Sequence, residues 1–298
     1  MVPRFRTRDH LRPQVLTEYQ IEWCEHCEFG RVAGEFTPSD VAGFYASEYY
    51  THFASVESDC RPVSLLDRLR VHLAWKADHG VVLSPSEIKP SQSLTLCDVG
   101  CGGGQTMAAF KQAGYDVVGI EPDPAARALA GKVGEVFEGT AERLPVALAG
   151  RKFGLVLLSH VLEHCIDPSA ALGNVRRLLA PGGAAVIEVP NNAATGFQMF
   201  GPGWFFADIP RHLQFFTARS LQRALESAGF RVTRVIYTGY TRQFSADWLT
   251  AQRLIRKHIG LDSGRAWGGN IWRLLATTVF ARPATKYDSV RIHAVYRP

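Results

Sequence analysis

A glycine-rich loop and a later carboxylate are the residues best suited to ligand binding. The stretch Asp98-Val-Gly100-Cys-Gly102-Gly-Gly104 follows a short apolar run, and Glu121 ends the next apolar run, twenty-one residues after Gly100. Glycines let a backbone turn tightly and approach a ligand, and a helix that starts behind them offers free N–H groups. A carboxylate at the position of Glu121 can accept the hydroxyl hydrogens of a ribose. The pattern predicts a nucleotide-type cofactor site.

Three histidines follow apolar runs and could remove a proton from a substrate. His160 and His164 flank Val-Leu-Glu, and His212 lies in Pro210-Arg-His-Leu-Gln-Phe-Phe-Thr217. Histidine titrates near neutral pH, which suits a general base. If a helix begins at His160, the i, i+4 spacing places His160 and His164 on one face. A structural role, as a hydrogen-bond partner of the backbone or of a carboxylate, is the alternative for each histidine.

The elements that position these residues alternate between strands and helices from residue 94 onward. Short apolar runs predict strands, and the segments between them suit helices that begin at prolines or polar caps and end at glycine. This alternation favours a mostly parallel sheet with helices on both faces. The expected strands are 94–100, 115–121, 133–139, 153–160, 184–190, 230–239 and 289–298; the expected helices are 64–79, 104–113, 122–131, 168–180 and 218–228.

The acid-x-G-x-G-x-G form of the glycine loop resembles motif I of the class I S-adenosylmethionine-dependent methyltransferases. The dinucleotide pattern G-x-G-x-x-G fails here, because Gln105 or Met107 stands at its sixth position. Residues 139–145 resemble the family's adenine-bordering segment, 153–164 its motif IV, and 178–183 its Leu-Leu-Lys-Pro-Gly-Gly turn. The resemblance covers 94–239. It implies a Rossmann-like α/β fold with a seven-stranded, mostly parallel sheet, and S-adenosylmethionine as cofactor.

The resemblance also implies which residues hold the cofactor. They are Asp98, Gly100, Cys101, Gly102, Gly104, Glu121, Thr140, Ala141, Glu142 and Ser159. Many relatives carry an acid where this chain has Thr140, so we expect the adenine contact to fall to the Ala141 backbone and Glu142. Cys101 could act as a thiol nucleophile, but a small residue tolerated in a tight turn is the simpler interpretation.

The resemblance makes His164, His212 and His160 the candidate catalytic residues. His164 matches a position where many small-molecule methyltransferases carry a catalytic histidine, and the segment around His212 resembles an element of a subfamily with ubiquinone-pathway, polyketide and sugar methyltransferases. We expect methyl transfer to a small or medium organic acceptor, most simply a hydroxyl of a sugar or glycan, quinone precursor or polyketide. C- or N-methylation stays open, because one scaffold serves all three. The aromatic side chains that offer an apolar wall for the acceptor, or simply pack a lid, are Phe197, Phe200, Trp204, Phe205 and Phe206.

Two other enzyme classes fit the sequence less well. A NAD-dependent dehydrogenase or epimerase shares the fold, but this chain lacks the dinucleotide glycine pattern and a Tyr-x-x-x-Lys pair after the fourth strand. A nucleic-acid base methyltransferase would carry an Asn/Asp-Pro-Pro-Tyr/Phe stretch where Ser159-His-Val-Leu stands. No basic arm is concentrated in the sequence, so we expect no nucleic-acid partner.

The N-terminal segment carries a cysteine pair with metal-ligand spacing. Cys24-Glu-His-Cys27 is half of a zinc knuckle, and the segment resembles an N-terminal module of some subfamily members. Those modules place a second Cys-x-x-Cys upstream, whereas here residues 1–20 offer only His10. We expect a degenerate module without metal, which folds by packing the aromatic residues of 44–53 on the main domain.

The C-terminal insertion has an amphipathic pattern. Residues 246–261 and 267–280 are expected to form two helices with interleaved apolar and basic residues. A surface that rests on a membrane or grips a lipid-linked substrate, a homodimer face, and plain packing against the edge of the sheet are the three alternatives.

Length and composition set the remaining limits. The 298 residues suggest about two domains. We expect an N-terminal module at 1–60, a helix and linker at 61–93, a Rossmann-like core at 94–239, the helical insertion at 240–288 and a final core strand at 289–298. The net charge of +5 is mild. Six cysteines in so long a chain do not form a disulfide framework, so we expect a cytoplasmic protein.

Overall fold

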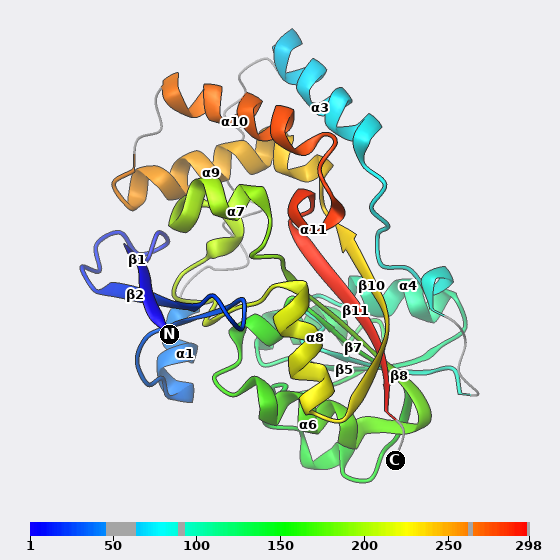
Figure 1. The fold of residues 1–298 in the computed structure, drawn as a ribbon. Coiled ribbons are helices and arrows are strands. Elements are labelled where there is room, and N and C mark those ends of the chain that lie inside the picture. The colour runs from blue at the N-terminus through cyan, green and yellow to red at the C-terminus, as the bar shows by residue number, and fades with distance from the viewer. Residues whose placement is uncertain (46–63, 89–92, 262–264, 297–298) are drawn as a thin grey trace. The chain divides into compact units, whose positions relative to one another are not determined.

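The chain folds into two compact units, each built from segments far apart in the sequence. The structure is a computed structural model, which describes residues 1–45, 64–88, 93–261 and 265–296 (Figure 1). The first unit comprises Met1–Gly80, Pro190–Thr217 and Tyr237–Ser289, and the second comprises Val81–Val189, Ala218–Ile236 and Val290–Pro298. The first unit therefore groups the expected N-terminal module with most of the expected insertion.

The second unit is organised around a seven-stranded sheet of order β10-β11-β8-β7-β4-β5-β6. Four neighbouring pairs, from β8 through β6, are parallel, and Figure 1 shows β10 and β11 running in opposite directions. The expected α/β fold and its seven strands are confirmed. The strands are β4 (Thr95–Val99), β5 (Asp116–Ile120), β6 (Glu135–Phe137), β7 (Phe153–Ser159), β8 (Leu179–Pro190), β10 (Phe230–Thr238) and β11 (Ser289–Tyr296).

Four helices of the second unit match helices that the sequence indicated. They are α4 (Gln105–Gln112), α5 (Pro124–Ala130), α6 (Pro168–Leu178) and α8 (Ala218–Ser227). Two begin at a capped proline: the Asp123 carboxylate accepts from Ala126 N, and the Asp167 carboxylate accepts from Ser169 N and Ala170 N. The core combines strand and helix side chains such as Leu96, Phe110 and Leu155. This packing fixes the carboxyl ends of the strands, from which the candidate site residues emerge.

Strand β8 begins earlier than the sequence suggested, at Leu179 rather than 184. Phe153 of β7 pairs with Leu179, while Leu155 pairs with Ala184, so the ladder contains a bulge. Gly182 has a φ of +76° within it, a conformation that glycine adopts readily. The Pro-Gly-Gly turn is therefore a bulge inside the strand.

The first unit contains a small sheet of order β1-β2-β3-β9. These strands were not expected from the sequence. They are β1 (Val2–Arg8), β2 (Glu18–Cys24), β3 (Phe29–Val32) and β9 (Gln214–Phe215). Gly30 of β3 pairs with Phe215 of β9, so the segment carrying His212 leads into a strand that completes the N-terminal sheet.

The helices of the first unit include the two expected in the insertion. They are α1 (Pro38–Phe44), α3 (Leu65–Ala77), α7 (Thr195–Phe200), α9 (Ala246–His258), α10 (Arg265–Thr278) and α11 (Pro283–Lys286). Phe44 packs edge-on against Tyr19 and Phe36 in this same unit; residues 46–53 of the expected aromatic cluster lie outside the described residues. Among the described residues, no helix has the length and apolar composition that crossing a bilayer requires.

Candidate active site

The glycine loop after β4 depends on left-handed backbone geometry. Gly100, Gly102 and Gly104 have φ values of +72°, +53° and +85°. A Cβ at Gly104 would lie 2.9 Å from the Ala130 Cα, whereas a Cβ at Gly102 would meet nothing within 4 Å. The close approach of Ala130 leaves no room for a side chain at Gly104. The open space at Gly102 leaves its backbone accessible to a ligand.

Glu121 follows β5 and closes over the loop. Its Oε2 accepts from Gly102 N at 2.8 Å, and its Oε1 accepts from Asp123 N at 2.9 Å. Burial raises the pKa of Glu121, and the two N–H donors oppose that shift. Because a carboxylate oxygen has two lone pairs, both oxygens can still accept a hydroxyl hydrogen from a ribose.

Asp98 lies next to the last residue of β4 and is only 3% exposed. Burial, together with the nearby Glu121, raises its pKa to about 7. A cation bound beside Asp98 would therefore lower this pKa and favour the ionised carboxylate.

Cys101 lies within the same loop as a packed, protonated thiol. A Cβ at Gly119 of β5 would lie 2.7 Å from the Cys101 Sγ, so this glycine makes room for the sulfur. Burial raises the pKa of the Cys101 thiol to about 12. Because only the thiolate is nucleophilic, these surroundings favour the simpler interpretation of a small residue in a tight turn.

The expected adenine-bordering segment is held by a residue that the sequence did not indicate. Asn174 of α6 donates from Nδ2 to the carbonyls of Ala141 and Glu142, each at 2.9 Å. The Glu142 Oε1 accepts from Asp167 N at 2.7 Å, and the Thr140 Oγ1 accepts from Arg143 N at 3.0 Å. The carboxylate of Glu142 therefore stabilises the start of α6.

His160 follows Ser159 at the end of β7, but no α-helix begins there. Its φ is +57°, and its N–H donates to the Glu188 carbonyl. A 3-10 turn spans Leu162–His164, and α6 begins only at Pro168. The expectation that His160 and His164 share one face of a helix is wrong, because the left-handed backbone at His160 interrupts helical geometry.

Two carboxylates surround the His160 ring. Nδ1 lies 3.3 Å from the Glu163 Oε1, and Nε2 lies 3.6 Å from the Glu188 Oε1. Burial would lower the pKa of His160, but Glu163 and Glu188 outweigh it and raise the pKa to about 9. The ring is therefore an imidazolium at neutral pH, a state that donates hydrogen bonds and cannot accept a proton.

A buried ion-pair network continues behind His160. The Glu188 Oε2 accepts from Arg291 Nε at 2.7 Å, Arg291 also pairs with Glu87, and His293 Nε2 lies 2.6 Å from the Glu87 Oε1. Arg291 is 2% exposed. The sequence signal for this network is a charged residue, Glu188 or Arg291, inside each of two mostly apolar strands, β8 and β11.

His164 ends the 3-10 turn after β7. Its N–H donates to the Val161 carbonyl at 3.0 Å, and its side chain is partly exposed. The histidine therefore follows the carboxyl end of a central strand, in the same unit as the glycine loop.

His212 belongs to the first unit and is buried at 5% exposure. Its Nδ1 lies 2.8 Å from the Phe206 carbonyl oxygen. A carbonyl only accepts, so Nδ1 carries the hydrogen and, in the neutral ring, Nε2 carries the lone pair. This hydrogen bond selects the tautomer that a general base with a reactive Nε2 requires.

The loop around His212 is fixed by a buried arginine. Arg211 donates to the Asp208 Oδ1 at 2.7 Å and to the Asp9 Oδ1 at 3.0 Å. Burial would raise the pKa of Asp208, but Arg211 outweighs it and holds the pKa well below the usual range. These ion pairs therefore connect the loop that carries His212 to Asp9, the residue that follows β1.

Three of the five aromatic residues expected to line an acceptor wall are packed in the core of the first unit. Phe197, Phe200 and Trp204 are at most 5% exposed. The Phe197 ring contacts the rings of Trp23, Trp204 and others. Phe205 and Phe206 are partly exposed and pack against Trp248. Only these two keep surface that an acceptor could touch.

Cys24 and Cys27 lie at the turn between β2 and β3. The Cys27 N–H points to the Cys24 Sγ at 3.3 Å and lowers the pKa of that thiol. Within the described ranges, neither cysteine belongs to a group of three or more ligand-type side chains close enough to share a metal ion. The two cysteines are half of the four ligands that a tetrahedral zinc site needs.

Comparisons with known proteins show that the chain is similar to methyltransferases. A family model described as a methyltransferase domain matches residues 70–235. A "Ubiquinone biosynthesis O-methyltransferase" of Cereibacter sphaeroides is 36% identical over 212 residues, which are 64% of this chain and 82% of that protein. The protein of the same name from another strain of this species is 30% identical over 244 residues, 72% of this chain and 95% of that protein.

One solved structure among the matches is a "SAM-dependent methyltransferase, possible histamine N-methyltransferase" from Thermotoga maritima. It aligns with 78% of this chain and 92% of its own, at 17% identity and a TM-score of 0.49.

The residues of the second unit fit S-adenosylmethionine. Gly102 leaves open space beside the loop, the Glu121 oxygens retain lone pairs for a ribose, and Asp98 can become the anion beside a cation. The matched model covers more than half of the chain. The chain therefore belongs to the class I S-adenosylmethionine-dependent methyltransferases, and S-adenosylmethionine is its cofactor.

Proposed function

We propose that the protein methylates a hydroxyl oxygen of a small or medium organic acceptor. Relatives named ubiquinone biosynthesis O-methyltransferases support transfer to oxygen, and the matches cover 82% and 95% of the length of two of them. A phenolic quinone precursor is the first acceptor to test, with sugar or glycan and polyketide hydroxyls as alternatives. We also propose that the acceptor is a small molecule rather than a nucleic acid, and that the protein acts in the cytoplasm.

The chemistry divides between cofactor and protein. Bound S-adenosylmethionine supplies a methyl group on a positively charged sulfur, open to in-line attack. The protein must orient the acceptor hydroxyl and take its proton. In the second unit, Glu121 and the backbone at Gly102 would hold the ribose and the loop side of the cofactor, with Asp98 as the anionic partner of its positive charge.

His212 is the base that the hydrogen bonds support best. The single observation that carries this assignment is the Nδ1–H···O=C bond to Phe206, which leaves Nε2 as the acceptor. The Asp208–Arg211–Asp9 ion pairs hold its loop in place. His164, partly exposed after β7, is the alternative base.

His160 would have a positioning role. As an imidazolium between Glu163 and Glu188, it neutralises two buried carboxylates and holds the turn that carries His164. A residue already protonated at the working pH cannot act as the base.

The test is transfer of labelled methyl to a panel of phenols, sugars and polyketides by wild type and three variants. General-base help is worth about 10²–10⁴ in rate, so His212→Ala or His164→Ala should lower turnover by that factor with little change in cofactor affinity. His72→Ala, at an exposed position of α3, is the matched control. The wild-type rate should fall as the pH drops through the titration of the base. Near-full turnover in both variants, with a rate independent of pH, would refute acid–base catalysis by these histidines.

A further inference from the structure

Helix α3 turns its apolar side away from the protein. Leu65, Leu66, Leu69 and Leu73 are 81%, 64%, 48% and 39% exposed, and Trp75 is 62% exposed. The buried residues of the helix are Arg70 and Ala74. A surface helix of a globular protein normally directs its apolar stripe toward the core, so α3 has the opposite orientation.

Polar contacts hold α3 in this orientation. Arg70 pairs with the Asp67 Oδ1 at 2.7 Å and reaches the Phe244 carbonyl at 3.5 Å. At the other end of the helix, Lys286 Nζ donates to the Ala77 carbonyl at 2.6 Å. Because the buried Arg70 holds the middle of the helix and Lys286 caps its C-terminal end, a rotation that buried the leucines would break these contacts.

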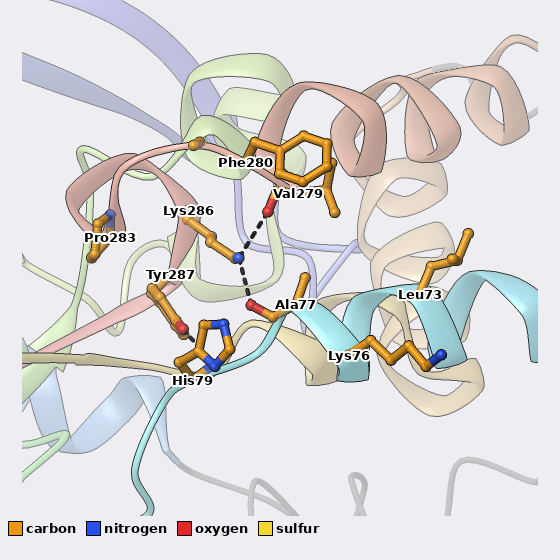
Figure 2. A pocket seen from close by; sticks show the side chains of 10 residues that line it. Leu73, Lys76, Ala77, His79, Val279, Phe280, Pro283, Lys286 and Tyr287 are labelled. Atoms are coloured by element: carbon orange, nitrogen blue, oxygen red, sulfur yellow. Dashed lines mark hydrogen bonds between the residues drawn. The ribbon is translucent and has the colours of Figure 1, made fainter.

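The apolar surface continues across a hollow to the end of α10. A cavity of about 540 Å³ is lined by Leu73 and Lys76 on one side and by Val279 and Phe280 on the other (Figure 2). Phe280 is 96% exposed. We call the five side chains Leu65, Leu66, Leu69, Leu73 and Phe280 the outer apolar face.

Positive charges accompany this face. Arg68 and Lys76 are exposed on α3, and Arg273 and Arg282 are exposed on either side of Phe280 in the sequence. The acid of α3, Asp67, is paired with Arg70. Basic side chains beside exposed leucine, tryptophan and phenylalanine are the composition of helices that lie in the interface of an anionic membrane.

We propose that the outer apolar face lies on the surface of an anionic phospholipid bilayer. The leucines and Phe280 would enter the headgroup boundary, and Arg68, Lys76, Arg273 and Arg282 would meet lipid phosphates. A two-fold dimer through this face would bring the same basic side chains of two copies together, so the charges favour lipid over a second copy.

The helices first considered for membrane contact contribute less to this surface. Ile255, Ile271, Leu274 and Leu275 of α9 and α10 are buried in the first unit, which is the packing expected of a core helix. The surface on the lipid is therefore α3 with the end of α10.

The test is co-sedimentation of the full-length protein with vesicles of phosphatidylcholine alone, and of phosphatidylcholine mixed with phosphatidylglycerol. Wild type should bind the mixed vesicles, and added salt should weaken the binding. Leu69→Glu should lower the partition coefficient at least about tenfold, because it places a charge in the apolar boundary. Lys76→Glu should lower it about fivefold per unit of charge removed, on the anionic vesicles only.

Val146→Glu is the matched control, since Val146 is an exposed apolar residue of the second unit, at 90% exposure. Val146→Glu should bind vesicles as wild type does. Leu69→Glu and Lys76→Glu should bind S-adenosylmethionine as wild type does, which would show that both variants fold. Three results would overturn the proposal. Wild type binds no vesicles; Leu69→Glu binds as wild type; or sedimentation velocity shows a dimer that Leu69→Glu dissociates, which would assign the face to a second copy.

Discussion

The affinity of the protein for S-adenosylmethionine should rise with pH, because Asp98 titrates near neutrality. In the absence of ligand, burial and Glu121 raise the pKa of Asp98 to about 7. The cofactor carries a sulfonium and an ammonium group, and a cation beside a buried carboxyl favours its ionised form. Binding should therefore release a proton from Asp98 below about pH 7, and the proton competes with the cofactor.

The size of the effect follows from linkage. If the cofactor returns the pKa of Asp98 to its ordinary value of about 4, the apparent Kd should increase about tenfold for each pH unit below 7. Between pH 8 and pH 6 the change should be about tenfold, equivalent to about 1.4 kcal/mol. Above pH 8 the affinity should be nearly constant, because Asp98 is already ionised.

Isothermal titration calorimetry at pH 6, 7 and 8, in buffers of different ionisation enthalpy, measures both the Kd and the proton released. Asp98→Asn should bind more weakly at pH 8 and lose the pH dependence. The control variant Asp116→Asn removes an exposed carboxylate at the start of β5, and its Kd should keep the pH dependence of wild type. A Kd that does not change from pH 6 to 8 in wild type, or that changes equally in Asp98→Asn, would show that Asp98 does not titrate with binding.

The raised pKa of Asp98 strengthens cofactor binding as the pH rises, but it should lower the stability of the ligand-free protein over the same pH range. A carboxyl whose pKa is raised on folding binds its proton more tightly in the folded state, so stability falls as the pH rises from about 4 to about 7. Asp98→Asn should therefore raise the melting temperature of the ligand-free protein at pH 8 while weakening cofactor binding. A lower melting temperature would mean that ionised Asp98 is satisfied by the fold itself.

Three further predictions concern other parts of the molecule. Glu121→Ala should weaken S-adenosylmethionine binding by about 1–3 kcal/mol in calorimetry, the scale of an unpaired buried polar group; tighter binding of NAD by wild type would contradict the site. Glu188→Gln should lower the pKa of His160 below about 9 in an NMR titration, since it removes one of the two carboxylates beside the ring; an unchanged pKa would mean that Glu188 does not act on it. Elemental analysis of protein purified without chelator should find little zinc, because Cys24 and Cys27 make only half of a site; one zinc per chain would contradict the degenerate module.

The sheet and the glycine loop could be predicted because their signals are local. Most strands of the second unit contain a short apolar run, and β4 and β5 are each followed within two residues by glycine or proline. Gly100, Gly102 and Gly104 adopt the positive φ values that glycine accommodates. The start of β8 could not be predicted in this way. Its first residue is set by pairing with Phe153, beyond a bulge at Gly182, and pairing partners are not visible in the sequence around 179.

The first unit was harder to predict because its contacts join distant segments. β3 finds its neighbour in β9, where Arg31 pairs with Gln214. The leucines of α3 follow helical spacing and correctly predicted a helix. The pattern could not show that Arg70 would face inward instead, because its inward partners, such as the Phe244 carbonyl, lie far along the chain. Periodicity identifies an apolar face, and tertiary contacts decide what that face meets.

His160 shows most clearly why residue type alone does not assign chemistry. As a histidine after a central strand, it met every local requirement for a general base. Its charge state is set by Glu163, three residues away, and by Glu188, which Arg291 orients from 103 residues further along the chain. Those carboxylates stabilise the protonated ring, whereas the Phe206 carbonyl leaves His212 a lone pair on Nε2. Two histidines that follow similar sequence patterns thus differ in the groups that face their rings: carboxylates face both ring nitrogens of His160, and a backbone carbonyl faces the Nδ1 of His212.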